Sequence, residues 1–370
     1  MHAHITVRCD PWGQLPTGEA VERYTLTAPN GVEVAISTLG ATLLHWLAPD
    51  REGRLANILL GFETPADYLA SDTHMGGLIG RWGNRIADAR FTLDTRVYEL
   101  EANDGVNSLH GGVRGFDRAV WRAERLDDGV RMHHVSPDGD AGFPGRLTVR
   151  VDFRLDVTGA LRLDYHAQCD APTPINLTSH PYFNLAATGT ALDHVVRIAA
   201  DRILATDATG IPVALRDVMD TAFDFRRGAN VRAQLEINDA ATRAIHGIDH
   251  CFVLGAATDR YVPLREVASA FEPVSGRELT VSTTERGLQF YTASNLEGVD
   301  GKGGLRHRAF DAICFEAQAW PNQINGMPDG AGVDTRGGSA ASDSSRAAEA
   351  VTLRPGDTYR QTTVYRTSVR

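Results

Sequence analysis

The sequence predicts an all-β protein, built as one large antiparallel β-sandwich with a few short helices. Three observations support this class. Apolar and polar residues alternate with a period of two over several segments, turn residues separate those segments, and strands do not alternate regularly with helices. Strands with this pattern bury one face and expose the other to solvent, which is typical of antiparallel sheets.

The clearest pair of strands lies within residues 146–167. The first strand carries charged residues between its apolar positions, and Thr158-Gly159 then turns the chain. The residues expected to share the buried face are Leu147, Val149, Val151, Phe153, Leu155 and Val157, followed by Leu161, Leu163, Tyr165 and Ala167.

Other segments carry weaker signals. Two alternating runs flank a hairpin turn at Pro29-Asn30-Gly31, and strands are also expected within residues 90–100 and 278–294. Short helices are expected at residues 65–71 and, on a weaker pattern, at residues 213–223. Residues 329–350 are rich in Gly, Ala, Ser and Asp and have no hydrophobic period. This composition predicts a low-complexity surface loop. The loop would be an insertion in a single domain that spans residues 1–370.

Composition limits the possible partners. The formal net charge of the 370 residues is −10, with both signs spread along the chain, which argues against binding to nucleic acid or to an anionic membrane. The four cysteines are scattered without a CxxC motif, and the N-terminal residues lack the apolar segment of a signal peptide. We therefore expect a cytoplasmic protein, either a monomer or a homodimer.

Two polar side chains stand out as candidates for acid–base chemistry. The segment INLTSHPYFNL, residues 175–185, gathers many hydrogen-bonding groups around His180, and Pro181 favours an extended backbone at that histidine. In the strand ICFEAQ, residues 313–318, Glu316 would face away from Ile313 and Phe315, toward either solvent or a cleft. A histidine and a carboxylate that share one cleft can act as a general acid and a general base.

Further polar groups occur in four other segments, and their mixture of donors and acceptors suits a polyhydroxylated ligand such as a sugar. These residues are Asn84, Arg85, His110, Asp249 and Gln289, with aromatic candidates for stacking at Trp82, Tyr182, Phe183, Phe290 and Trp320.

Each candidate residue also has a plain structural interpretation. His180 would then be a buried histidine bonded by Asn176 or Thr178, and Glu316 an exposed strand carboxylate. The glycines Gly111-Gly112 allow close approach of a ligand to the backbone but also suit a simple turn. His74 has no ligand set near it in the sequence, and no metal site is expected.

Six motifs, in order from about Gly31 to the C-terminus, resemble those of the aldose 1-epimerases, or galactose mutarotases. The matching segments are GRWGNRIADARFTLD with NDGVNSLHGGVRGFDRAVW, INLTSHPYFNL, GIDHCFVL, GLQFYTASN, CFEAQAWPNQIN and LRPGDTYRQTTVYR. Several ordered motifs are far more specific than any one of them.

This resemblance implies the galactose mutarotase-like supersandwich fold and the interconversion of the α and β anomers of free aldoses such as galactose and glucose. It implies no metal and no organic cofactor. By the resemblance, His180 matches the general acid and Glu316 the general base. The positions that match sugar-binding residues are Asn84, Arg85, His110, Tyr182, Asp249 and Gln289.

The chain departs from the family pattern at Pro181, Ala317 and Trp320, and these changes are expected to alter the rim of the pocket. Two other functions fit the same fold. A hexose-phosphate epimerase would need cationic groups for the phosphate, for which Arg85 and Arg114 are candidates. A non-catalytic sugar-binding protein would not require an acid–base pair, so the presence of both His180 and Glu316 argues against it.

Overall fold

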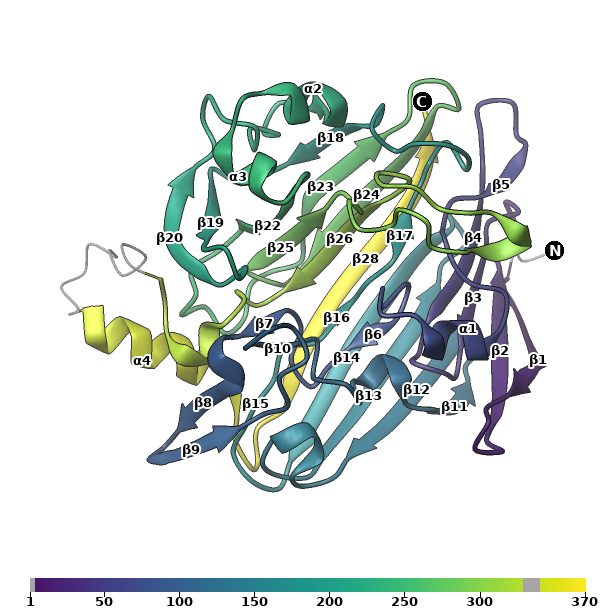
Figure 1. Ribbon diagram of the computed structural model, residues 1–370. Helices are drawn as coiled ribbons and strands as arrows, with labels where there is room; N and C mark the ends of the chain where they lie inside the picture. Colours follow the sequence, from purple (N-terminus) through teal and green to yellow (C-terminus); the bar gives the residue numbers. More distant parts are fainter. Residues whose placement is uncertain (1–3, 329–339) are drawn as a thin grey trace.

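The structure is a computed structural model that describes residues 4–328 and 340–370 (Figure 1). Within these residues the strands form sheets of nine, six and five strands and four two-stranded ribbons. The strand pairs inside the three large sheets are antiparallel. The predicted all-β class is confirmed.

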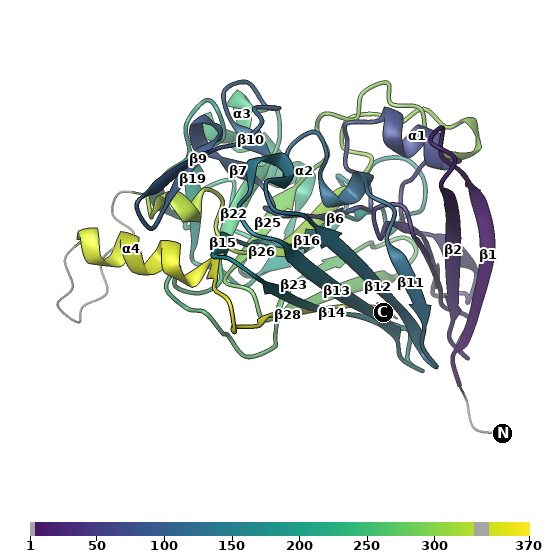
Figure 2. The ribbon, with the colours of Figure 1, turned by 90° about the horizontal axis from the view of Figure 1, so that it is seen from below.

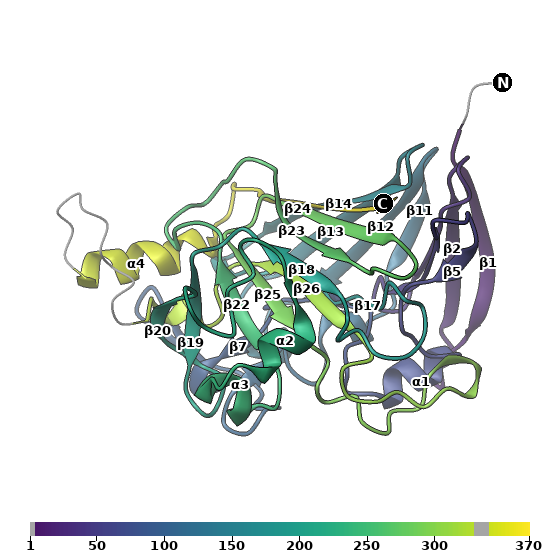
Figure 3. The same ribbon diagram turned by 90° about the horizontal axis from the view of Figure 1, so that it is seen from above.

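The two largest sheets lie as layers over a shared hydrophobic core (Figures 2 and 3). The nine-stranded sheet has the order β11 (Arg122–Arg125), β12 (Gly129–Ser136), β13 (Leu147–Leu155), β14 (Ala160–Cys169), β28 (Tyr359–Val369), β24 (Arg277–Thr283), β23 (Arg265–Phe271), β18 (Val195–Ile198) and β21 (Ala229–Asn230). The six-stranded sheet has the order β17 (Tyr182–Phe183), β26 (Ile313–Gln318), β25 (Gly287–Tyr291), β22 (Asp249–Val253), β19 (Arg202–Thr206) and β20 (Pro212–Asp217).

The N-terminal part of the chain forms the third sheet, drawn in purple in Figure 1. Its strands are β1 (Thr6–Gln14), β2 (Ala20–Thr27), β3 (Glu33–Ser37), β4 (Leu43–Pro49) and β5 (Leu55–Asn57). The ribbons pair β7 (Arg85–Ile86) with β10 (Ser108–Leu109), β6 (Leu78–Ile79) with β16 (Thr178–Ser179), β8 (Arg90–Leu93) with β9 (Arg96–Glu99), and β15 (Thr173–Pro174) with β27 (Thr352–Leu353).

Helices are few and short. They are α1 (Pro65–Ala70), α2 (Val231–Glu236), α3 (Ala240–Ala244) and α4 (Ala340–Ala350), with 3-10 turns at Ala87–Ala89, Phe116–Arg118, Asp140–Gly142, Lys302–Gly304 and Gln323–Asn325. Helix α1 confirms the prediction for residues 65–71. Its start is fixed by a capping box, in which Thr64 Oγ1 accepts from Asp67 N and the Asp67 carboxylate accepts from Thr64 N.

The clearest predicted strands are present in the predicted register. β13 and β14 pair so that Phe153 lies opposite Leu163, and the alternate residues of both strands are buried. Val157 is the exception, because β13 ends at Leu155 and the Val157 side chain is half exposed.

Two expectations about local structure are wrong. Residues 213–223 form no helix: β20 runs through Asp217 and pairs with β19, because sheet pairing outweighs a weak helical pattern. Residues 340–350 form helix α4 and not a loop. Alanine is the strongest helix former, and the buried Ala347 of α4 packs in one cluster with Trp320. Residues 329–339 of the predicted loop lie outside the described residues, and the single domain over 1–370 stays a prediction.

The two main layers are joined at the strand that carries Glu316. Tyr365 of β28 donates its hydroxyl to the carbonyl of Phe315 at 3.0 Å, and Gln361 of β28 donates to the carbonyl of Ala317 at 3.0 Å. The two bonds flank Glu316 on either side. Buried carbonyls are costly when unpaired, so these contacts hold β26 at a defined position above the nine-stranded sheet.

Candidate active site

Seven of the eight residues predicted for the site line one cleft, which encloses about 230 Å³. The eighth, Gln289, lies next to it and donates its side-chain Nε2 to Asp249 Oδ1 at 2.6 Å. The full lining is Asp72, Thr73, His74, Asn84, Arg85, Leu109, His110, His180, Tyr182, Asp249, Tyr291, Asn295, Leu296 and Glu316. The fold thereby brings together the eight predicted residues from six separate segments of the sequence.

Sheet pairing brings His180 and Glu316 together. His180 lies between β16 and β17, and Tyr182 of β17 pairs with Cys314 of β26, two residues before Glu316. The main chain at His180 is fixed on both sides, since its N–H donates to Gly77 O and its carbonyl accepts from Gly76 N. His180 Nε2 then lies 3.5 Å from Glu316 Oε1.

The alternation of β26 places Glu316 toward the cleft, which is one of the two orientations that the sequence leaves open. Ile313, Phe315 and Ala317 belong to the main core, whereas Cys314 and Glu316 face the other way. Glu316 is 2 % exposed, and its Oε2 atom has no hydrogen-bond partner among the residues that the structure describes. A buried carboxylate oxygen that faces a cavity without a partner is costly in a purely structural role, which favours a role in ligand chemistry.

Burial favours the neutral forms of both groups. It lowers the pKa of His180 to about 3, with nearby His74 as a smaller cause. Burial also raises the pKa of Glu316 well above its ordinary value; nearby Asp249 adds to this effect and Arg85 opposes it. Burial therefore favours a neutral imidazole at His180 and a protonated carboxyl group at Glu316.

The tautomer of His110 is fixed by a backbone hydrogen bond. Its Nδ1 accepts from Asn84 N at 3.1 Å, and burial lowers the pKa of His110 well below its ordinary value. The neutral ring must then carry its proton on Nε2, which makes that atom a donor. Asn84 and His110 both have positive φ angles, 63° and 53°, a strained backbone region that is common at functional sites.

Three possible metal ligands gather in the cleft, on His110, His180 and Glu316, with their ligand atoms within 4.8 Å of one another. The donor chemistry does not suit a metal. A ligating nitrogen must offer a free lone pair, and the Asn84 bond places the His110 proton on Nε2. His110 is therefore better suited to donate to a hydroxyl oxygen.

Two charged groups of the cleft, Arg85 and Asp249, have partners just outside its lining. Arg85 of β7 donates its Nε to Asp104 Oδ2 at 2.7 Å. Asp249 begins β22 and accepts from Gln289 of β25, a residue that lies directly opposite Glu316 in the register of β25 and β26. Donors and acceptors thus converge on this cleft, a combination that suits a ligand rich in hydroxyl groups.

Tyr182 supports His180 directly. The two rings are stacked, with centroids 5.0 Å apart and an interplanar angle of 12°. The Tyr182 hydroxyl donates to Thr73 O at 3.0 Å, which fixes the tyrosine ring. Tyr182 is thus a wall of the cleft and also a support that orients His180.

The other aromatic candidates are wrong as stacking residues. Trp82, Phe183, Phe290 and Trp320 are buried in hydrophobic clusters and do not line the cleft. Trp320 lies against Ala347 of α4, so its departure from the family pattern changes the packing under α4 and not the cleft rim. The close backbone approach expected at Gly111 is to the chain itself, because a Cβ there would lie 2.1 Å from Gly80 O.

The sequence did not indicate His74 or Tyr291, which both line the cleft. His74 Nδ1 lies 2.9 Å from Asp117 Oδ2, and its ring centroid lies 4.8 Å from that of His110. His74 had no sequence signal apart from neighbouring glycines. Tyr291 lies two residues after Gln289 on β25, so period-two alternation was the signal that could have found it.

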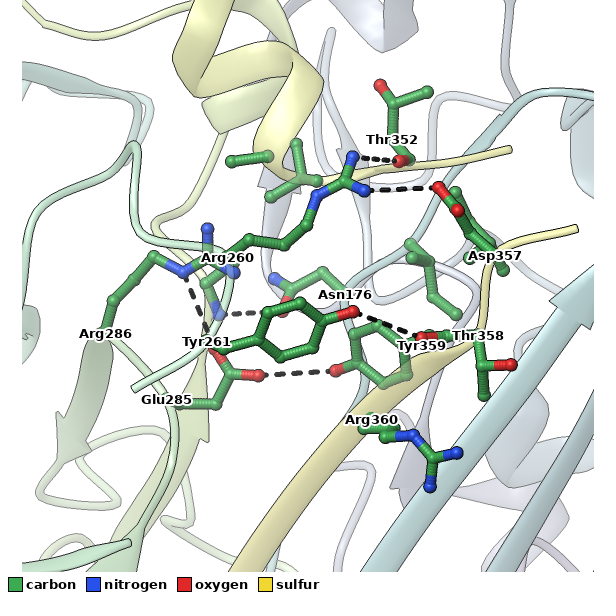
Figure 4. Close-up of a pocket in the computed structure, with 15 residues that line it drawn as sticks. Asn176, Arg260, Tyr261, Glu285, Arg286, Thr352, Asp357, Thr358, Tyr359 and Arg360 are labelled. Atoms are coloured by element: carbon green, nitrogen blue, oxygen red, sulfur yellow. Dashed lines mark hydrogen bonds and ion pairs between the residues drawn. The ribbon is translucent and has the colours of Figure 1, made fainter. Parts of the chain in front are cut away.

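Figure 4 shows a separate crevice, which is lined by residues such as Arg260, Glu285 and Tyr359 and contains none of the eight predicted residues. Arg260 closes it by pairing with Asp357 at 3.2 Å, and Tyr359 donates its hydroxyl to Glu285 at 3.4 Å. Its free space is about 30 Å³. That volume suits a water molecule and excludes a sugar, so this crevice is not the candidate site.

Comparison with known proteins defines the family. The model of the family described as aldose 1-epimerase matches residues 22–366. The galactose mutarotase of Rattus norvegicus is 38 % identical over 370 residues, 99 % of each chain, and the aldose 1-epimerase of Escherichia coli is 36 % identical over 313 residues, 84 % of this chain and 89 % of that protein. The crystal structure of a galactose 1-epimerase from Lactobacillus acidophilus superposes with a TM-score of 0.80 at 26 % identity, covering 99 % of both chains.

The fold and the site thus define a sugar isomerase. The chain belongs to the aldose 1-epimerase family. Within the residues that the structure describes, no helix is both long enough and apolar enough to cross a bilayer.

Proposed function

We propose that this protein interconverts the α and β anomers of free aldoses, galactose and glucose among them, with His180 as general acid and Glu316 as general base. The observation that carries the assignment is the pair itself: a buried histidine and a buried carboxylate, 3.5 Å apart, at one cleft. The other cleft residues hold the sugar through its hydroxyl groups. No metal or organic cofactor is part of the proposal.

The proton transfers of the reaction balance within the pair. In the sugar complex, Glu316 takes the proton of the C1 hydroxyl while the bond between C1 and the ring oxygen breaks. His180 gives its proton to that ring oxygen, and an open-chain aldehyde results. After rotation about the C1–C2 bond, the same hydroxyl attacks the other face of the aldehyde. His180 then recovers its proton and Glu316 returns its own to the carbonyl oxygen.

Burial of the pair fits this cycle. When the ring is open, Glu316 is protonated and His180 is neutral, which are the forms that burial favours. The same single proton serves the ring-closed state, in which it sits on His180. Burial therefore stabilises the enzyme form that accompanies the open-chain aldehyde, the state that the reaction must reach.

The hexose-phosphate alternative lacks a suitable cation at the cleft. Arg85 is the arginine of the described cleft lining, and Asp104 already pairs with it. Arg114, the other candidate, is exposed and is not among the lining residues. A phosphate dianion would also meet the side chain of Asp249, which supplies acceptors and no positive charge. We therefore expect neutral sugars as substrates.

Polarimetry tests the proposal. Fresh solutions of α-D-galactose and α-D-glucose are followed to equilibrium with the wild type, His180→Asn and Glu316→Gln. We expect the wild type to accelerate the change in rotation and each substitution to lower the enzymatic rate by about 10²–10⁴-fold. Val97→Trp, on the exposed strand β9, is a control that should keep full activity. A folded wild type without effect on either sugar would refute the proposal.

A further inference from the structure

One histidine of the cleft takes no part in the proton transfers proposed above. His74 lines the cleft, and its Nδ1 atom lies 2.9 Å from Asp117 Oδ2. We infer that His74, held by Asp117, is a further sugar-binding residue, whose Nε2 atom contacts a hydroxyl group of the bound aldose other than the one at C1. The inference rests on the proposed function, because the reacting sugar must occupy the cleft.

The carboxylate of Asp117 fixes which nitrogen of His74 is left for a ligand. An ionised carboxylate accepts hydrogen bonds and donates none, so Nδ1 of His74 must be the donor of this bond. Among the residues that the structure describes, Nε2 of His74 has no hydrogen-bond partner. A hydroxyl group both donates and accepts, so it can bond this Nε2 whether the imidazole is neutral or charged.

The segment that carries His74 is fixed to the wall of the cleft. Thr73 O accepts from the Tyr182 hydroxyl at 3.0 Å, and Gly77 N donates to His74 O at 3.1 Å. The turn that carries Asp117 packs directly against this segment, since a Cβ at Gly77 would lie 2.7 Å from Asp117 Cβ. A side chain that is already held in place loses little freedom when a ligand binds, which favours a role in recognition.

His110 offers the complementary hydrogen-bonding group beside His74. The centroids of the two rings lie 4.8 Å apart, with an interplanar angle of 59°. Because Nδ1 of His110 accepts from Asn84 N, the Nε2 atom of His110 is a donor. The neutral His74 ring presents an acceptor at its own Nε2. A donor and an acceptor on neighbouring rings suit two neighbouring hydroxyl groups of one sugar.

The position of His74 points to a hydroxyl group that does not react. The ligand atoms of His110, His180 and Glu316 lie within 4.8 Å of one another. In the proposed reaction, Glu316 and His180 serve the C1 hydroxyl and the ring oxygen. His74 adjoins this group at the ring of His110. Its contact is therefore assigned to a hydroxyl group at C2, C3, C4 or C6.

Two substitutions separate sugar binding from a purely structural role, which would require the bond to Asp117 alone. In His74→Asn, the side-chain amide nitrogen takes the place of Nδ1, so the donor to Asp117 is kept and the cleft nitrogen is lost. In His74→Gln, the amide reaches the place of Nε2, so a polar group remains at the cleft and the donor to Asp117 is lost. His133→Phe is the matched control, because His133 also pairs with a carboxylate, Glu124 at 3.4 Å, and is not among the lining residues.

The test measures kcat and KM by polarimetry for galactose and for the deoxy analogues that lack the hydroxyl at C2, C3, C4 or C6. We expect His74→Asn to raise the KM for galactose by about threefold to tenfold, with kcat changed by less than about twofold. His74→Gln should stay closer to the wild type, and His133→Phe should match it. For one deoxy analogue, the one without the contacted hydroxyl, His74→Asn should raise the KM by less than about twofold. Melting temperatures show that each variant is folded.

Three results would overturn the role of His74 while leaving the proposed function in place. These are a galactose KM that His74→Asn leaves unchanged, a KM that rises by the same factor for galactose and every deoxy analogue, and a larger loss in His74→Gln than in His74→Asn. The last result would show that the bond to Asp117, and not the cleft nitrogen, matters for activity. A wild type inactive on every sugar would overturn the proposed function as well.

Discussion

His180 Nε2 lies 3.5 Å from Glu316 Oε1, with the two side chains 6 % and 2 % exposed. This separation is longer than an ordinary hydrogen bond, so the two groups are close enough to share one substrate without being bonded to each other. Burial lowers the pKa of His180 and raises the pKa of Glu316, so it favours the neutral forms of both groups. The proposed chemistry moves protons between these two groups and the sugar.

The pH dependence of catalysis follows from the same arrangement. A second proton would have to bind His180, whose pKa burial lowers to about 3. We therefore expect kcat/KM for galactose to lack the acid limb near pH 6.5 that an ordinary histidine would give. Rates measured between pH 4.5 and 8, corrected for the uncatalysed reaction, check this. A limb with an apparent pKa of about 6.5 that vanishes in His180→Asn would contradict the assignment.

Glu316 is expected to lower the stability of the folded protein at neutral pH. Its folded-state pKa is raised by burial, so the folded state holds a proton that the unfolded state releases above its ordinary pKa. The free energy of unfolding then falls as the pH rises above about 4.5. Glu316→Gln removes this cost while keeping the shape of the side chain.

The measurement is the melting temperature of wild type and Glu316→Gln at pH 4 and pH 7.5. We expect Glu316→Gln to melt at least roughly 2 °C higher at pH 7.5, since each kcal/mol shifts the melting temperature of a large domain by about 2–4 °C. At pH 4 the two proteins should melt close together. A variant that melts lower than wild type at pH 7.5 would show that the Glu316 carboxylate is stabilised in the fold.

Gly210 is expected to set the position of Arg85. Gly210→Ala places a Cβ against the guanidinium and should raise the KM for galactose by about tenfold, by displacing Arg85 from the cleft. Gly189→Ala is the matched control, because Gly189 also has a positive φ, +66°, but has no atom within 4 Å of the added Cβ. Both variants place alanine at a positive φ. Equal effects of the two substitutions on the KM would therefore refute the idea that contact between residue 210 and the Arg85 guanidinium positions that arginine.

Much of the fold was predictable because many of its strands carry a clear local alternation of apolar and polar residues. β13 and β14 alternate cleanly and pair where the turn at Thr158-Gly159 requires. The errors occur where local signals are weak. Residues 340–350 look like a loop by composition, yet they form α4 once Ala347 can pack in the cluster that contains Trp320.

The site was predictable residue by residue only through ordered motifs. Period two alone placed Glu316 on the opposite face from Phe315, and the structure confirms that placement. No local pattern reveals that His74 faces the cleft, because its place depends on contacts with Asp117 and His110, which lie far along the chain. The catalytic and binding roles themselves stay predictions.

The most direct test of the central claim is a double-mutant comparison of mutarotation rates, with His180→Asn, Glu316→Gln and the variant that carries both changes. If the two groups act as one acid–base pair, each single change removes most of the enzymatic rate and the second change adds little. The account predicts that the double variant is no more than about tenfold slower than the slower single variant. Single variants that retain near wild-type rates, or losses that multiply in the double variant, would contradict it.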